Sequence, residues 1–240
     1  TLEYRDPYWN LDGVSLGGKV FFNTFEASEA GIVDYTNESY GTNLTWGFPF
    51  DELNRFEFGL GYTHNKIGDA DDSYEHIARF MQSIGVEPGD DIITNDFDIN
   101  LAWTRNNLNK GYFPTAGSHQ RASYMMTVPG SDAKYFKLQY DVRNYTPLTK
   151  KHDFSLLMRG RLGYGNGYGK TDGNDNLFPF YENYYAGGFT SLRGFASNSV
   201  GPRAVQVNRS SSCGNNGCVT ATDDSVGGNA VALASLELIF

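Results

Sequence analysis

Apolar and polar side chains alternate along most of this chain. In residues 134–148, Phe136, Leu138, Tyr140 and Val142 share one side, and charged or amide side chains fill the positions between them. Successive side chains of a strand point to opposite faces, so a period of two predicts β-strands rather than helices. The same period recurs in NLTWGF (43–48), NRFEFGLGYT (54–63), NDFDINLAWT (95–104) and HQRASYMMTV (119–128).

Segments with this pattern are long and regularly spaced. Most reach the roughly 9–11 residues that a tilted strand needs to cross a bilayer. Short turns alternate with mostly longer connections, which include an acidic loop around 67–94 and a very long loop around 167–226. Such asymmetry between two rims is typical of bacterial outer-membrane barrels. We expect about nine strands, near residues 1–9, 13–26, 38–49, 54–67, 95–107, 118–129, 134–148, 153–166 and 227–240.

A soluble β-sandwich is the alternative fold, because its strands also alternate apolar and polar side chains. Its strands usually run about five or six residues, shorter than the segments here. The apolar side of these segments carries Trp, Tyr and Phe, and the other side carries Arg, Lys, Asp and Glu, where a sandwich would need its core. The sequence therefore favours an all-β, antiparallel transmembrane β-barrel. Single-chain bacterial barrels have an even strand number, so nine strands predict a partial wall, and we interpret both ends of the chain as cut.

Composition narrows the class of partner. The chain has 28 acidic and 19 basic residues, a formal net charge of −9, which argues against a nucleic-acid surface because that would need a basic stripe. No run of about 18 apolar residues predicts a transmembrane helix, and we expect no signal peptide because no basic-then-apolar leader is present.

The familiar catalytic and metal motifs are incomplete. YGNGYGKT (164–171) resembles a phosphate-binding loop, but the position five before Gly169 is Tyr164 rather than glycine. The four histidines lie on different segments without metal-ligand spacing. We expect no enzyme activity, no cofactor and no metal. Cys213 and Cys218 are predicted to close a small disulfide loop in an oxidising compartment, with free thiols as the alternative.

The long loop contains an unusual stretch, YYAGGFTSLRGFASNSVGPRAV (184–205). Its glycines allow tight turns, and its apolar side chains would be exposed if the loop lay outside. We expect the loop to fold back into the barrel, where the guanidinium of Arg193 needs a partner because it leaves bulk water. Glu237 faces inward and can be that partner if the alternate residues of 230–238 face lipid. A disordered surface loop is the alternative.

This stretch and several others resemble a known family. FYENYYAGGFTSLRGFASNSVGPRAV, followed by DDSVGGNAVALASLE, resembles the BamA family of outer-membrane β-barrel assembly proteins, and more broadly the superfamily of insertases and two-partner-secretion transporters. GYFPTAGS (111–118), DGVSLGGKVFFN (12–23) and YTNESYGTNLTWGFP (35–49) also resemble its barrel segments. The resemblance implies that residues 1–240 form one partial barrel domain, about strands four to twelve of sixteen, with extracellular loop 6 at about 167–226 and no periplasmic POTRA repeats.

The resemblance also implies a site. Leu192, Arg193, Gly194 and Phe195 would anchor the loop inside the barrel, and Glu237 would be the wall partner of Arg193. A second acidic partner would come from a later strand outside this chain. BamA-type proteins can also carry a loop disulfide where the cysteine pair lies.

The implied function is the insertion and folding of outer-membrane β-barrel proteins in a Gram-negative outer membrane, without ATP, through a lateral seam. The implied partners are the lipid bilayer, unfolded outer-membrane proteins, and assembly-machinery lipoproteins that bind through POTRA repeats. A two-partner-secretion-type transporter that exports a passenger polypeptide, and a passive porin, are the alternatives.

Overall fold

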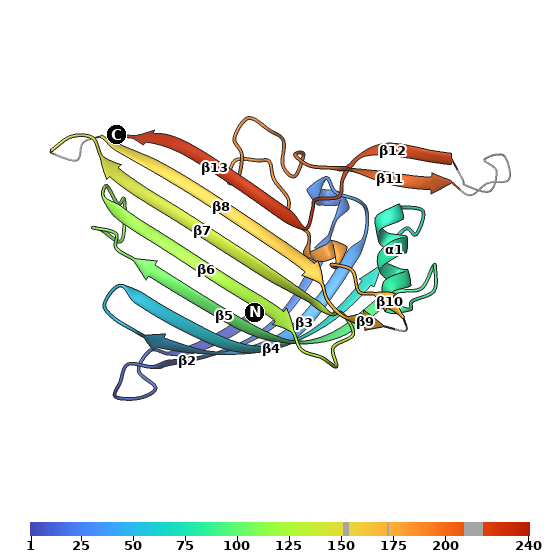
Figure 1. Cartoon of the computed structure of the whole chain (residues 1–240), viewed down its shortest axis with the longest axis horizontal. Helices are drawn as coiled ribbons and strands as arrows, with labels where there is room; N and C mark the ends of the chain where they lie inside the picture. Colours follow the sequence, from blue (N-terminus) through green and yellow to red (C-terminus); the bar gives the residue numbers. More distant parts are fainter. Residues whose placement is uncertain (151–153, 172, 209–217) are drawn as a thin grey trace.

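The computed structural model describes residues 1–150, 154–171, 173–208 and 218–240. Within these ranges, nine strands form one antiparallel sheet in the order β1-β2-β3-β4-β5-β6-β7-β8-β13, which curves as an open wall (Figure 1). The strands are β1 (Leu2–Asp6), β2 (Ser15–Glu26), β3 (Thr36–Pro49), β4 (Asn54–Gly68), β5 (Ile92–Asn106), β6 (Gly117–Thr127), β7 (Tyr135–Pro147), β8 (Ser155–Gly167) and β13 (Ala230–Ile239).

The all-β antiparallel wall and its nine predicted strands are confirmed, with ends that move by a few residues. β13, predicted over 227–240, and β1, predicted over 1–9, each shorten by four residues. β1 stops at Asp6 because the carboxylate of Asp6 accepts a hydrogen bond from the Tyr8 N–H, which begins a turn. The two longest connections, from β4 to β5 and from β8 to β13, lie at the end of the wall that carries α1 (Figure 1).

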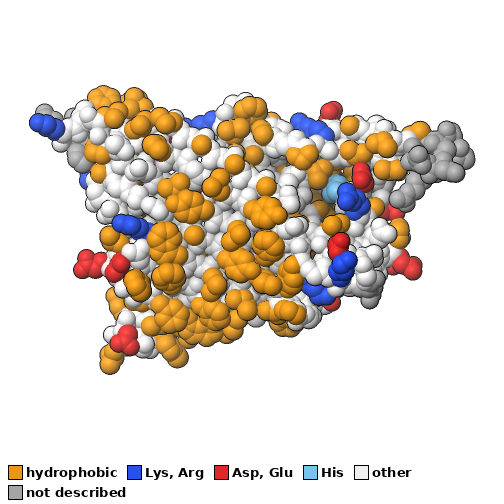
Figure 2. Space-filling view, viewed as in Figure 1, with side chains coloured by type: hydrophobic (Ala, Val, Ile, Leu, Met, Phe, Trp, Pro, Cys, Tyr) orange, Lys and Arg blue, Asp and Glu red, His pale blue; other side chains and the backbone are white. Residues whose placement is uncertain are grey.

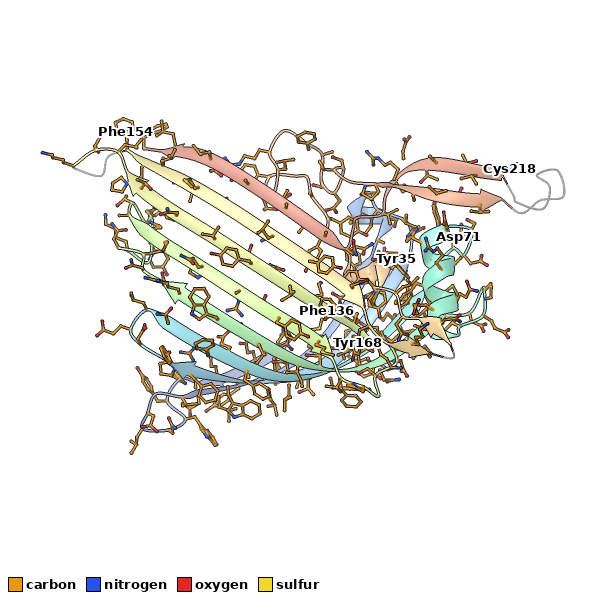
Figure 3. All side chains as sticks on the ribbon, in the orientation of Figure 1. Tyr35, Asp71, Phe136, Phe154, Tyr168 and Cys218 are labelled. Carbon is orange, nitrogen blue, oxygen red and sulfur yellow. The ribbon has the colours of Figure 1, made fainter. Side chains whose placement is uncertain are left out.

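One face of the wall carries the apolar side chains that the alternation predicted to face lipid. The register aligns them across strands, with Leu60 opposite both Leu44 and Ile99. Leu60 is 43% exposed and Leu236 is 67% exposed. Figure 2 shows such side chains gathered over the central strands, and Figure 3 shows Phe136 among them. A continuous exposed apolar surface of this kind marks contact with a membrane or a protein.

The long connections contain structure that the sequence analysis missed. Residues 67–94, expected as a loop, include helix α1 (Glu75–Ile84), whose Ile77, Phe80 and Met81 form a buried stripe. In the described part of the chain no helix is both long and apolar enough to cross a membrane. The remaining short elements are η1 (Ser28–Ala30), η2 (Phe180–Glu182) and two hairpins, β9 (Lys170–Thr171) with β10 (Asn174–Asp175) and β11 (Arg203–Asn208) with β12 (Cys218–Ser225).

The hydrophobic core of the described residues lies at this end rather than in the wall. Phe180 is 4% exposed, and its ring meets Tyr35 edge-on at 5.1 Å and Phe80 at 5.6 Å between centroids. Figure 3 shows Tyr35 in this region, close to α1. We call the cluster the dome; its buried members are Ala27, Ile32, Val33, Tyr35, Ile67, Tyr74, Ile77, Phe80, Met81, Ile92, Phe180 and Ala204.

Candidate functional site

The tip of the long loop, residues 187–195, is a compact turn. The Leu192 N–H donates to the Gly188 carbonyl at 3.0 Å, and the Gly188 N–H donates to the Phe195 carbonyl at 3.1 Å. Gly187 has a φ of 116° and Gly194 a φ of 90°, conformations that L side chains rarely adopt. A Cβ at Gly187 would also overlap the Ala196 carbonyl. The glycines are therefore required to form the turn that projects Arg193.

Arg193 reaches the inner face of the wall. Its Nη1 lies 3.3 Å from Oε2 of Glu237, and its guanidinium stacks 4.7 Å from the Phe189 ring centroid. Glu237 points inward because the neighbouring positions Leu236 and Leu238 of β13 occupy the apolar outer face. The structure thus brings together the arginine and the carboxylate that the sequence singled out.

Glu237 has a second cationic neighbour that sequence reasoning missed. Nε of Arg159, on β8, lies 3.6 Å from Oε1 of Glu237. The register places Arg159 opposite Ser235, two residues before Glu237 and on the same face. The alternation of β8 could have shown that Arg159 faces inward, but only the strand register shows that it meets this carboxylate.

A cavity of about 340 Å³ separates the tip from the wall. Arg161, which also lines it, pairs with Asp141 at 2.7 Å. Among the described residues, the cavity therefore has more guanidinium than carboxylate groups in its lining, which contains Arg143, Arg159, Arg161, Arg193, Asp141 and Glu237. Water reaches this region, since 53% of the Arg193 side chain is exposed, so the pair is worth less than a fully buried one.

The apolar residues of the tip differ from expectation. Phe195 keeps 56% of its surface exposed and Phe189 78%, while Leu192 is half-buried. In the described residues, then, Phe195 is not sheltered by packing against the wall. Among the described residues, the Arg193–Glu237 ion pair joins the tip to the wall.

The predicted disulfide cannot be placed against this geometry. Cys213 lies outside the described residues, and Cys218 begins β12. The pairing of Cys213 with Cys218 stays a prediction.

A further polar cluster on the inner face was not anticipated. Glu57, on β4, lies 2.9 Å from Arg121, 3.6 Å from Arg5 and 3.9 Å from Arg55. Only 18% of its side chain is exposed. Ion pairs that join β4 to β1 and to β6 therefore lie on the lumen side of the wall, opposite the apolar outer face.

Comparison with known proteins agrees with this arrangement. Residues 1–240 match the Omp85 superfamily domain. The chain is 30% identical over its whole length to the outer membrane protein assembly factor BamA of Neisseria meningitidis serogroup B, and 24% identical over 69% of its length to a SAM50-like protein of Schizosaccharomyces pombe. It covers 28% and 30% of those two proteins, so it spans less than a third of either relative.

A solved structure shows the same wall. The crystal structure of BamA from Haemophilus ducreyi lacking POTRA domains 1–3 superimposes with a TM-score of 0.87 at 39% sequence identity, over 98% of this chain and 43% of that one. With an inward arginine at a glycine-rich loop tip and a two-faced wall of matching topology, the chain belongs to the Omp85 superfamily and corresponds to part of a BamA-type barrel.

Proposed function

We propose that this chain is part of an assembly factor that inserts and folds β-barrel proteins in the outer membrane of a Gram-negative bacterium. It would supply about strands four to twelve of a sixteen-stranded barrel, with loop 6 at about 167–226. The observation that carries the proposal is the Arg193–Glu237 contact between loop tip and wall, because a passive pore has no need of it. The names of the BamA relatives support the same function.

The two faces of the wall suit the proposed work. The apolar face would contact lipid, and a short apolar band would thin the bilayer near the protein. Elsewhere in the full barrel, a weakly paired seam would offer a free strand edge that templates an incoming strand through backbone hydrogen bonds. Such templating requires no nucleotide and no catalytic group, so we propose a protein that is not an enzyme. Accessory lipoproteins would bind through POTRA repeats.

Arg193 would hold the tip on the wall beside β13. Breaking a buried pair costs about 3–5 kcal/mol, whereas an exposed pair is worth under about 1 kcal/mol. The Glu237 side chain is 23% exposed, so we expect a value between these limits. The tip can thus be released at modest cost during substrate insertion.

The test uses charge reversal in the full-length protein, in cells depleted of the wild type. Arg193→Glu should lower the amount of folded outer-membrane β-barrel proteins, and adding Glu237→Arg should restore part of it. Lys110→Glu, at an exposed turn, is the control and should have no effect. If Arg193→Glu and Glu237→Arg are each harmless alone, the tip–wall pair has no role in assembly.

Depleting cells of the wild-type protein also distinguishes the proposed function from the two alternative functions. Normal levels of folded barrels together with loss of one secreted polypeptide would indicate a two-partner-secretion-type transporter. Normal levels with reduced uptake of small solutes would indicate a porin.

A further inference from the structure

The segment that leads into the tip lies along a row of glycines on β8. We call this segment, residues 176–184, the limb. A Cβ built on Gly163 would lie 2.8 Å from the Tyr184 ring, one on Gly165 would overlap the Phe178 ring, and one on Gly167 would overlap the Asn176 backbone. These glycines occupy alternate positions, so all three face the lumen. Their missing side chains leave the space that the limb fills.

A lysine on the neighbouring strand holds the limb in this space. Lys137, on β7, is directly opposite Gly165. Its Nζ donates to Oε2 of Glu182 at 2.7 Å and to the Glu182 carbonyl at 3.1 Å. It also lies 5.0 Å from the ring centroid of Tyr184. A charge-assisted pair with a second hydrogen bond and a cation–π contact fixes position more strongly than a lone surface pair.

The cation of the limb's pair is better sheltered than the cation of the tip's pair, whereas the Glu182 carboxylate, at 32% exposed, is less sheltered than that of Glu237, at 23%. The Lys137 side chain is 22% exposed, whereas that of Arg193 is 53% exposed. Less water around the ammonium makes its attraction to Glu182 stronger and less sensitive to salt.

The limb is held from other sides as well. Tyr184 exchanges backbone hydrogen bonds of 2.8 and 2.9 Å with Gly228, and its hydroxyl donates to the Leu138 carbonyl at 3.2 Å. Phe180, in the middle of the limb, belongs to the buried core of the dome. The backbone hydrogen bonds of the tip, by contrast, include those that close its own turn between Gly188 and Phe195. Limb and tip therefore depend on different contacts.

We propose that the limb is a second and independent wall anchor of the loop, with Lys137 as its positioning residue. The tip leaves the wall by breaking the Arg193–Glu237 pair, while the limb and the dome stay in place. Under this arrangement the loop end of the lumen remains covered while space opens between tip and wall. The inference rests on contacts of the described residues and holds whether or not the proposed function is correct.

Hydrogen–deuterium exchange of the full-length protein in lipid nanodiscs tests the proposal, because it measures limb and tip amides separately. In Lys137→Met, exchange of residues 176–184 should rise about tenfold or more, as expected for the loss of a charge-assisted hydrogen bond. Lys137→Arg keeps the charge and should remain close to wild type. In Arg193→Ala, exchange should rise in residues 187–195 only.

A second pair of variants keeps the test decisive if Lys137→Met does not fold, as judged by heat-modifiable migration in gels. Gly165→Ala puts a methyl where the Phe178 ring lies and should raise limb exchange. Gly59→Ala is the matched control, because this glycine faces the lumen on β4 and its Cβ would meet Asn100 at 3.2 Å, away from the loop. Limb exchange that rises in Arg193→Ala, or that stays unchanged in both Lys137→Met and Gly165→Ala, would overturn the proposal.

Discussion

The tip and the dome are held in place by different kinds of interaction. The dome buries aromatic rings around Phe180, which is 4% exposed, and the limb ties it to the wall. The tip leaves Phe189 and Phe195 largely exposed and reaches the wall through a half-exposed ion pair. The attraction within a buried apolar cluster is the sum of many small contacts. A partly hydrated ion pair is weak and can exchange partners. The difference separates a fixed cover from a releasable contact.

The largest expected difference between the dome and the tip comes from replacing a phenylalanine with alanine in each. Phe180→Ala should destabilise the dome by about 3–5 kcal/mol, because a buried ring leaves a cavity. Phe189→Ala, at a ring that is 78% exposed, should change stability by no more than about 0.5 kcal/mol. Denaturant-dependent hydrogen exchange of the dome amides measures both. Equal effects would show that the dome has no separate core.

Acid should weaken the dome through His76, on α1. Its ring lies 5.9 Å from the Phe180 ring, and burial lowers the pKa of His76 to about 4. An unfolded histidine has a pKa near 6.5, so as the pH falls the unfolded state takes up the proton first. Dome stability should therefore decrease between pH about 6.5 and about 4 and then level off, by on the order of 1–2 kcal/mol after allowance for partial exposure.

The matched variant for this prediction is His76→Phe, which keeps a ring against Phe180. Exchange of the dome amides, measured across the pH range and corrected for the intrinsic rate, should lose the part of its pH dependence that wild type shows in that window. An identical slope in both proteins would assign the acid effect to other groups.

Substitution of a positive-φ glycine in the tip should have a smaller effect on stability. Gly194 has a φ of 90° with open space around its Cβ, so Gly194→Ala introduces backbone strain without a clash, costing about 1–2 kcal/mol. Tip exchange should rise and limb exchange should not. Gly111→Ala, also in open space but without a positive φ, is the control and should leave both segments unchanged.

The parts predicted from sequence are those fixed by local pattern. The alternation around Phe136 and Leu60 gave the strands and their two faces, because the period of a strand depends on adjacent residues only. The inward direction of Glu237 followed from the same parity, and the glycine-rich stretch around Arg193, with its family resemblance, indicated Arg193 as its partner.

The parts that were missed depend on contacts distant in sequence. Helix α1 lay in an acidic segment that read as a loop, although the spacing of Ile77, Phe80 and Met81 carried its signal. The Arg159 contact with Glu237 requires the register between β8 and β13, and the Lys137 contact requires the path of the limb. Neither can be obtained from one strand's own sequence.

The dependence of the two segments on salt tests the central claim most directly. Raising ionic strength from about 0.1 M to about 1 M shortens the Debye length from about 10 Å to about 3 Å. Hydrogen exchange in wild type should then accelerate in residues 187–195 and stay constant in residues 176–184. Burial of Phe180 and the Lys137 pair keep the limb in place. Equal acceleration in both segments, or none in the tip, would contradict the account.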